Sequence, residues 1–174
     1  PFPSAELLER GLAELGFPEA DGIVECGGPA GGAAVRGRSS LVPLFNRYIR
    51  ELELFNAVFD LVGAESGTER GRSDLVVRHI LDSLSPWKRI ASLASERMIT
   101  ERSRGSDVRA IELADAGSGA GFPGLPLAIA FPGIRVTLVE RMSKRCAFLE
   151  NCVAMLRLST SDRRLSTGLT GTAA

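Results

Sequence analysis

At residues 115–124 the chain reads Asp-Ala-Gly-Ser-Gly-Ala-Gly-Phe-Pro-Gly, and this stretch decides the fold. Mostly apolar residues precede it at 111–114 and follow it at 125–130. Glycine has no Cβ, so glycines at alternate positions let the backbone turn sharply and approach a ligand closely. A strand that leads into such a turn and then into a helix is the usual base of a nucleotide-type site. The stretch therefore predicts an α/β fold with a ligand beside the turn.

The spacing of the glycines distinguishes between two kinds of ligand. A dinucleotide motif G-x-G-x-x-G that begins at Gly117 would need a glycine where Phe122 stands, and one that begins at the next glycine starts late and contains a proline. The pattern D/E-x-G-x-G-x-G of S-adenosylmethionine (AdoMet) dependent methyltransferases fits Asp115, Gly117, Gly119 and Gly121 without adjustment. This register favours AdoMet, and an NAD(P)-binding oxidoreductase fragment stays as an alternative.

Two acidic residues complete the pattern. Asp115 ends the first expected strand, where an acid supports the ammonium group of the cofactor. Glu140 ends the next expected strand, where a carboxylate accepts hydrogen bonds from the ribose hydroxyls. A plain glycine-rich connection is the other interpretation, but it requires the acids, the glycine spacing and the following helix to coincide by chance.

The flanking sequence predicts a β-turn-α-β-α unit. Strands are expected at 110–115 and 135–139, the second buried on both faces of a parallel sheet. Pro123 suits the first turn of the helix between them, and Ser143 is expected to cap a further helix that ends near Leu156. A right-handed crossover would place the two strands side by side.

The sequence before this unit is mainly helical by its periodicity. Apolar residues at steps of three and four predict a long helix from Leu41 to Phe59. Ser73 is expected to cap a helix that ends at Leu84, before Pro86. The other expected elements are a helix at 4–16, a glycine-rich loop at 26–40, a polar loop at 64–72, a helix at 87–97 and a basic loop at 101–109.

Composition and charge exclude several classes of protein. The 174 residues are 44% hydrophobic and 24% charged, which is typical of a globular chain. The 21 basic and 21 acidic residues give no overall attraction to nucleic acid, so any RNA contact needs a local patch. No apolar run approaches the roughly 20 residues of a membrane span, and the first residues lack the features of a signal peptide. The cysteines lack metal-site spacing, so we expect reduced thiols, no metal and a cytoplasmic location.

Three segments together resemble one family. They are residues 78–84 (Arg-His-Ile-Leu-Asp-Ser-Leu), residues 115–129, which extend the glycine stretch to Leu-Pro-Leu-Ala-Ile, and residues 144–149 (Lys-Arg-Cys-Ala-Phe-Leu). In this combination and order the chain resembles the bacterial small-subunit ribosomal RNA methyltransferase G family, also called glucose-inhibited division protein B. The resemblance covers about residues 41–158, and residues 59–63 look like a diverged form of a further family segment.

The resemblance implies a class I, Rossmann-like AdoMet methyltransferase fold with an N-terminal helical extension. It also implies transfer of a methyl group from AdoMet to N7 of a guanine in 16S rRNA. On this basis the expected cofactor-binding residues are Gly117, Phe122, Asp115, Gly119, Gly121 and Glu140.

No catalytic residue is expected for this chemistry. Guanine N7 has a lone pair and no proton to remove, so the reaction needs alignment with the methyl group more than a general base. His79, the only histidine, is interpreted as a packed or capping side chain, although its family motif brings it towards the site.

RNA contact would come from clusters of basic residues, because these neutralise phosphates. The first candidates are Arg78, Arg141, Lys144 and Arg145. Further basic positions, each explained equally well as solvated surface, are Arg70, Arg72, Arg102, Arg104 and Arg109. The expected partner is 16S rRNA or the small ribosomal subunit, bound by a monomer.

The organisation of the chain follows from these assignments. An N-terminal helix and Gly-rich loop at 1–40 and a helical extension at 41–108 precede the first half of an AdoMet-binding domain at 109–158. Residues 159–174 are expected to be a polar tail without strands, because the apolar pattern stops at Leu158. Family members continue there with further strands, so the C-terminal part of the sheet is expected to be missing. A truncated, inactive remnant that serves as an RNA-binding or interaction module is the alternative to an enzyme.

Overall fold

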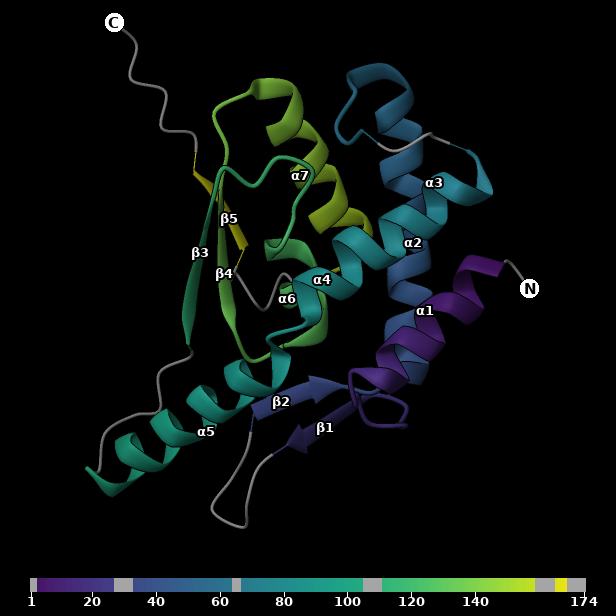
Figure 1. Cartoon of the computed structure of the whole chain (residues 1–174). Helices are drawn as coiled ribbons and strands as arrows, with labels where there is room; N and C mark the ends of the chain where they lie inside the picture. Colours follow the sequence, from purple (N-terminus) through teal and green to yellow (C-terminus); the bar gives the residue numbers. More distant parts are fainter. Residues whose placement is uncertain (1–2, 27–32, 64–66, 105–110, 159–164, 169–174) are drawn as a thin grey trace, which may run out of the picture.

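The computed structural model describes residues 3–26, 33–63, 67–104, 111–158 and 165–168. The helical elements are α1 (Pro3–Glu14), α2 (Arg38–Phe59), α3 (Glu69–Asp74), the π-helix η1 (Leu75–Leu81), α4 (Asp82–Leu84), α5 (Trp87–Ser103), α6 (Gly124–Ala130) and α7 (Ser143–Met155). The strands are β1 (Ile23–Cys26), β2 (Ala33–Arg36), β3 (Glu112–Ala116), β4 (Arg135–Val139) and β5 (Leu165–Gly168). Figure 1 shows helices packed on one side of a small sheet, which makes this a mixed α/β fold, as predicted.

Strands β3, β4 and β5 form a parallel sheet in that order. Asp115 in β3 is opposite Leu138 in β4. Asp115 near the end of β3 and Glu140 just after β4 therefore lie at the same edge of the sheet. The prediction that the first two strands of the unit lie side by side is confirmed.

Strand β5 contradicts the prediction that residues 159–174 form a tail without strands. Its four residues pair with β4, from Val136 opposite Leu165 to Val139 opposite Gly168. A short strand is held by backbone hydrogen bonds to its neighbour and needs no alternating apolar pattern, so periodicity did not reveal it. Within the described ranges the parallel sheet therefore has three strands instead of two.

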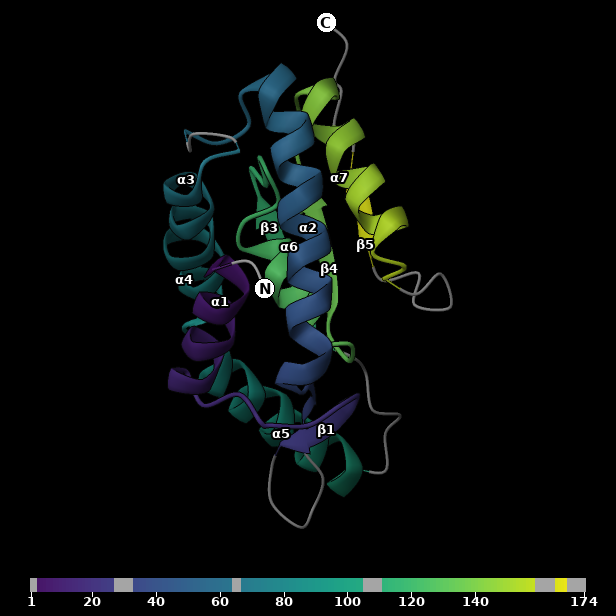
Figure 2. The same cartoon turned by 90° about the vertical axis from the view of Figure 1, so that its right-hand side faces the viewer.

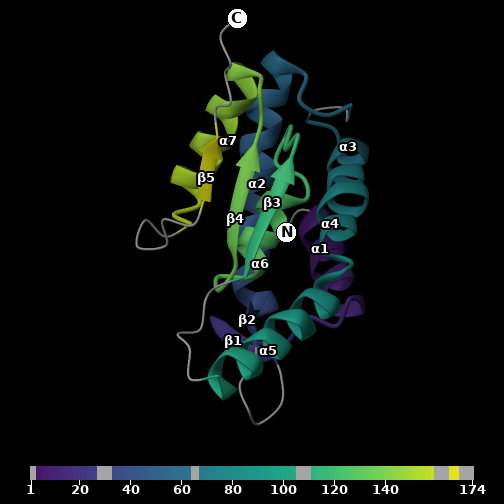
Figure 3. The ribbon, with the colours of Figure 1, turned by 90° about the vertical axis from the view of Figure 1, so that its left-hand side faces the viewer.

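In the described part of the chain, helices cover one face of this sheet and leave the other open (Figures 1 and 3). Helices α6 and α7 pack on the strands, and α2 packs across both helices (Figure 2). On the covered face Val136 and Leu138 are fully buried, whereas Arg135 points to the other face and is exposed. The prediction that 135–139 is buried on both faces was wrong, because the described helices lie on the opposite side of the sheet or beyond its end.

Strands β1 and β2 form an antiparallel hairpin. The prediction of a glycine-rich loop at 26–40 was wrong here, although its middle part, 27–32, lies outside the described residues. Strand β2 packs against α5 and α6, where Ala33 and Val35 are buried. These small side chains are buried by contacts with distant helices, and a local apolar pattern does not report such contacts.

Helix α2 is the long amphipathic helix predicted from apolar spacing. It buries Phe45, Tyr48 and Leu52 against α1, α6 and α7. Its apolar side chains join the core of the helical part to Leu138 in the sheet, so one hydrophobic core runs through both parts. None of the described helices combines the length and the apolar character needed to cross a membrane.

The helical segment after α2 begins earlier than predicted. Its N-cap is Thr68, whose Oγ1 accepts a hydrogen bond from the Gly71 N–H at 3.0 Å. The expected polar loop to residue 72 and the expected cap at Ser73 were therefore wrong, because threonine is also a favoured N-cap residue and the helix begins at the earlier of the two. From there the segment continues through η1 and ends at Leu84, as predicted.

Two later boundaries also differ. Helix α5 continues to Ser103 instead of ending at 97, so the expected basic loop begins within a helix, and its residues 105–109 lie outside the described ranges. Ser143 is the first residue of α7 and not its cap, because Met142 stands at the N-cap without a side-chain bond.

Candidate functional site

The glycine turn lies across the end of the parallel sheet. After β3, the N–H groups of Gly117 and Ser118 donate to the Val139 carbonyl at 2.8 and 3.0 Å, so the turn is fixed to the end of β4. The φ angles of Gly117, Gly119 and Gly121 are 82°, 57° and 97°. All three lie in the left-handed region, which explains why glycine stands at each position.

The glycines of the turn differ in the space around them. A Cβ on Gly121 would lie 2.5 Å from Leu125 Cδ1, and one on Gly124 would lie 2.4 Å from Leu138 Cδ2. A Cβ on Gly117 would meet no heavy atom within 4 Å, and one on Gly119 would meet only the Gly117 carbonyl oxygen, at 3.8 Å. Gly121 and Gly124 therefore allow close internal packing, whereas Gly117 and Gly119 border open space that a ligand can enter.

Asp115 is buried at the base of the turn. Its Oδ2 accepts a hydrogen bond from the Gly124 N–H at 3.1 Å. Burial raises the pKa of the Asp115 carboxyl, and hydrogen bonds from the Gly124 N–H and the Ser118 side chain offset only part of this effect. A buried carboxylate whose pKa is raised is stabilised in its ionised form by a nearby cation.

Glu140 is buried on the other side of the turn. Its Oε2 accepts from the Gly119 N–H at 2.9 Å, and its Oε1 accepts from the N–H groups of Arg141 and Met142 at 2.8 and 2.9 Å. Burial acts to raise the pKa of Glu140, but the three backbone donors outweigh it and the pKa is lowered. Glu140 is therefore ionised at neutral pH, and its oxygens keep acceptor directions for hydroxyl groups.

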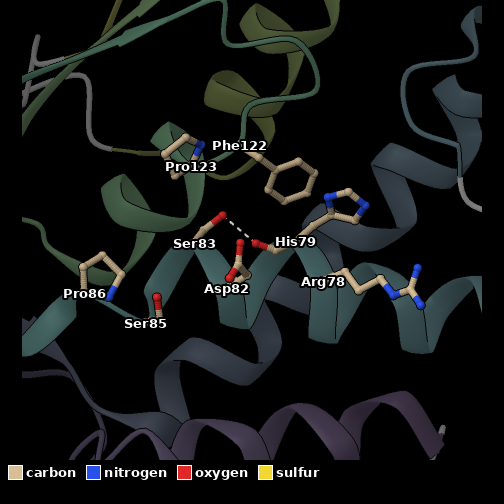
Figure 4. A pocket seen from close by; sticks show the side chains of 8 residues that line it. All are labelled: Arg78, His79, Asp82, Ser83, Ser85, Pro86, Phe122 and Pro123. Atoms are coloured by element: carbon tan, nitrogen blue, oxygen red, sulfur yellow. Dashed lines mark hydrogen bonds between the residues drawn. The ribbon is translucent and has the colours of Figure 1, made fainter.

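Aromatic residues from three elements support the far side of the turn. The Phe122 ring stacks on His79 of η1, with ring centroids 5.0 Å apart and an interplanar angle of 28° (Figure 4). Tyr48 of α2 packs on the same ring, and its hydroxyl donates to the Ala120 carbonyl at 2.6 Å. Tyr48 is fully buried, which confirms the prediction that it belongs to the core.

His79 packs within this group, in line with the sequence interpretation. Burial is the main reason that its pKa is lowered, so the imidazole is neutral at pH 7. It lies in the π-helix, a rare conformation that is frequently found at functional sites. Sequence composition gave no signal for this conformation.

A cavity of about 400 Å³ opens beside Phe122 and Pro123 (Figure 4). Its opposite wall is formed by η1 and α4, including His79, Asp82 and Ser83. Sequence analysis did not nominate Asp82 or Ser83, although both belong to the segment 78–84 that carries the family resemblance. The volume lies within the range of about 300–1,000 Å³ found for small-ligand sites.

The predicted RNA-binding residues fall into two groups on different sides of the turn. Arg78 lies at the cavity, is exposed and pairs with Asp74 at 3.3 Å. Arg141, Lys144 and Arg145 lie at the start of α7 next to Glu140. The structure therefore does not bring all four together.

The three basic residues near the start of α7 differ in their exposure and surroundings. Arg141 and Lys144 are exposed, and the Lys144 ammonium lies 5.5 Å from the centroid of the Phe59 ring. Arg145 is half-buried, and its charge helps to lower the pKa of Glu140. Arg145 thus supports the acid beside the turn as well as offering charge to a ligand.

The other basic positions are less suited to binding. Arg72 forms two hydrogen bonds with Glu53, at 2.6 and 2.8 Å, which explains its presence structurally. Arg70 and Arg104 are exposed, the side chain of Arg102 is outside the described part, and so is the whole of Arg109. Among the described residues no group of three or more His, Cys, Asp or Glu side chains is placed to hold a metal ion.

Comparison with known proteins gives one consistent result. The sequence model of the family described as rRNA small subunit methyltransferase G matches residues 42–163. The ribosomal RNA small subunit methyltransferase G of Treponema denticola is 37% identical over 171 residues, which cover 90% of this chain and 59% of that protein. The proteins of the same name from Aquifex aeolicus and Stenotrophomonas maltophilia are 40% identical over 106 residues and 32% identical over 163 residues. These matches cover 61% and 92% of this chain, and 46% and 57% of those relatives. The chain therefore spans about half the length of the curated relatives it matches.

Proposed function

This chain belongs to the rRNA small subunit methyltransferase G family, and we propose that it holds the methyl donor AdoMet for methylation of 16S rRNA at guanine N7. The observation that carries the proposal is the turn itself: open space over Gly117 and Gly119 lies between the buried carboxylate of Asp115 and the ionised carboxylate of Glu140. The first suits a cation, and the second suits hydroxyl groups.

AdoMet carries an ammonium group and ribose hydroxyls, the two kinds of group that these acids can bind. In the proposed complex Asp115 takes the ammonium group, directly or through water, and Glu140 takes the ribose hydroxyls. Gly117 and Gly119 let the methionine part lie against the backbone, Gly121 allows the turn to close on the core, and Phe122 borders the site. When bound, AdoMet supplies a methyl group on a sulfonium: the N7 lone pair forms the new N–C bond, the C–S electrons return to sulfur, and no proton leaves.

The chain's own residues then have a positioning role, and none is proposed as a general base. The bonds from Gly117 and Ser118 to the Val139 carbonyl hold the turn in one place at the sheet edge. His79 is neutral and packs on Phe122, so it adds no positive charge beside a cationic donor.

The proposed fold is the class I, Rossmann-like methyltransferase fold. The parallel order β3-β4-β5 and the turn at the carboxyl end of β3 support it, because ligands of open α/β sheets bind at the carboxyl ends of the strands. We assign residues 41–108 to a helical extension and 109–158, with β5, to the AdoMet-binding part.

The proposed RNA contacts use the exposed cations on both sides of the turn. Arg78 lies on the cavity side, and Arg141, Lys144 and Arg145 lie on the α7 side. An RNA strand whose phosphates contact both groups of cations would run across the turn. The partner in this proposal is 16S rRNA or the small ribosomal subunit.

Transfer of labelled methyl groups from AdoMet to small subunits that lack this methylation tests the proposal. The chain should produce N7-methylguanine, and Gly117→Asp should abolish transfer by placing a carboxylate in the open space beside Asp115. Gly67→Asp is the matched control, because Gly67 also has a left-handed φ, of 77°, and a Cβ on it meets nothing within 4 Å. RNA binding without AdoMet binding would favour the alternative of an inactive RNA-binding module instead.

A further inference from the structure

The cavity beside Phe122 contains a carboxylate that the cofactor site does not use. Asp82, the first residue of α4, is exposed and lines the cavity wall opposite Phe122 and Pro123 (Figure 4). Its sequence neighbour at the i−4 position, Arg78, pairs with Asp74 at 3.3 Å instead. No group in the described part of the chain donates a hydrogen bond to the Asp82 carboxylate, so its oxygens are free for a ligand.

We propose that this cavity receives the target base of the RNA and that Asp82 selects guanine by accepting hydrogen bonds from its N1–H and 2-amino groups. The inference rests on the proposed function, because it places the base directly beside the turn proposed to hold AdoMet. Methyltransferases that act on a base take it out of the stack into a pocket, and read it by hydrogen bonds to its Watson–Crick edge and by stacking.

The walls of the cavity provide the stacking surface. His79 and Phe122 present two aromatic rings that already stack on each other, 5.0 Å apart. Stacking on an aromatic ring stabilises any base, because every base has a π-face, and it therefore gives affinity without selectivity. A second feature of the cavity must supply the selectivity.

The carboxylate of Asp82 supplies the selectivity for guanine. Guanine presents two adjacent donors on its Watson–Crick edge, and an ionised carboxylate presents two adjacent acceptors. Adenine presents an unprotonated N1 in the same place, and its lone pair would face the carboxylate. The N7 atom belongs to the other ring of the purine, so a contact at N1 and the 2-amino group leaves N7 free to face the turn.

The charge of Asp82 also suits the reaction. Methylation at N7 leaves the purine positively charged, and a carboxylate on its N1–H interacts more strongly as that charge develops. An acid is otherwise unfavourable in a site for polyanionic RNA, because it repels phosphates. Arg78, at the same cavity and 75% exposed, is placed to attract the backbone while Asp82 contacts the base.

A titration with mononucleotides tests the proposal on the chain itself. His79 is the only histidine in the chain, so its imidazole gives one set of ring signals in nuclear magnetic resonance spectra. GMP, IMP and AMP share the ribose and phosphate and differ in the edge that Asp82 would contact. GMP should shift the His79 signals in a saturable manner at concentrations up to about 10 mM, with an affinity at least about fivefold above that of AMP and with IMP between them.

Asp82→Asn keeps the shape of the side chain and should remove the preference for GMP, lowering GMP affinity at least about fivefold. Asp60→Asn makes the same change of charge at an exposed residue outside the cavity and should bind GMP as the wild type does. The proposal is overturned if GMP leaves the His79 signals unchanged, if AMP binds equally well, or if Asp82→Asn keeps the preference. AdoMet binding, measured on the same samples by calorimetry, separates the two claims: AdoMet binding without GMP selectivity refutes only the base pocket, and GMP selectivity without AdoMet binding refutes only the methyl-donor site.

Discussion

Replacement of Gly121 by alanine should destabilise the fold more than the same replacement at Gly117. Both residues have a φ in the left-handed region, 97° and 82°. A Cβ on Gly121 would lie 2.5 Å from Leu125 Cδ1, 2.9 Å from Leu125 Cγ and 3.0 Å from the Tyr48 hydroxyl, whereas a Cβ on Gly117 meets nothing within 4 Å. The pair therefore separates the conformational cost of the turn from its packing.

The magnitudes follow from these contacts. The left-handed conformation costs a non-glycine residue about 1–2 kcal/mol, and this cost applies to both variants. Overpacking adds about 1–3 kcal/mol for Gly121→Ala, because Leu125 is fully buried and the Tyr48 hydroxyl is held by the Ala120 carbonyl. We expect losses of about 1–2 kcal/mol for Gly117→Ala and about 2–5 kcal/mol for Gly121→Ala.

Urea unfolding followed by circular dichroism measures the two losses. An unchanged slope of the free energy against urea would show that both variants unfold from the same native state. In thermal unfolding Gly121→Ala should melt about 2–12 °C below Gly117→Ala. Equal losses in the two variants would refute the assignment of Gly121 to packing and of Gly117 to open space.

Three further predictions concern the surroundings of the turn. Because the pKa of His79 is lowered in the folded chain, the unfolded chain binds more protons below about pH 6.5. This residue should therefore make the free energy of unfolding fall as the pH drops below that value. His79→Gln should flatten this part of a pH–stability curve, and an unchanged curve would contradict the assignment. Tyr48→Phe leaves the Ala120 carbonyl without its donor and should cost about 1–3 kcal/mol in urea unfolding, whereas a loss near zero would show that water replaces the hydroxyl. Exchange of both Arg141 and Lys144 for alanine should weaken binding to 16S rRNA. It should also reduce the slope of log affinity against log salt concentration by about 0.7 for each lost phosphate contact. Filter binding at several salt concentrations measures this slope, and an unchanged slope would place the RNA elsewhere.

Local sequence features predicted the elements that carry the proposed cofactor site. The alternate glycines predicted the turn because the left-handed backbone at all three positions disfavours other side chains. The apolar run at 135–139 predicted β4 with its observed bounds, and the apolar spacing from Leu41 predicted α2. Both acids lie at the sheet edge where the strand pattern placed them.

The features that sequence reasoning missed depend on contacts between distant segments. Strand β5 is held by pairing with β4, and strand β2 of the hairpin is buried by α5 and α6, so neither has a strong pattern of its own. The cavity with Asp82 exists because η1 packs against the glycine turn through His79 and Phe122. The family motif at 78–84 marked this helix as important, but only the packing shows that its carboxylate faces a cavity.

Calorimetric titration of the wild-type chain and of Asp115→Asn with AdoMet shows whether the glycine turn and its buried acid hold the methyl donor. Asparagine can still accept the Gly124 N–H bond, and it removes a buried charge whose pKa is raised by burial, so the fold should be kept. We expect that the wild type binds AdoMet and that Asp115→Asn binds it at least about tenfold more weakly, a difference of ~1.4 kcal/mol, while Asp60→Asn binds as the wild type does. Equal affinity of Asp115→Asn and wild type, or no heat of binding from the wild type at about 1 mM AdoMet, would contradict this expectation.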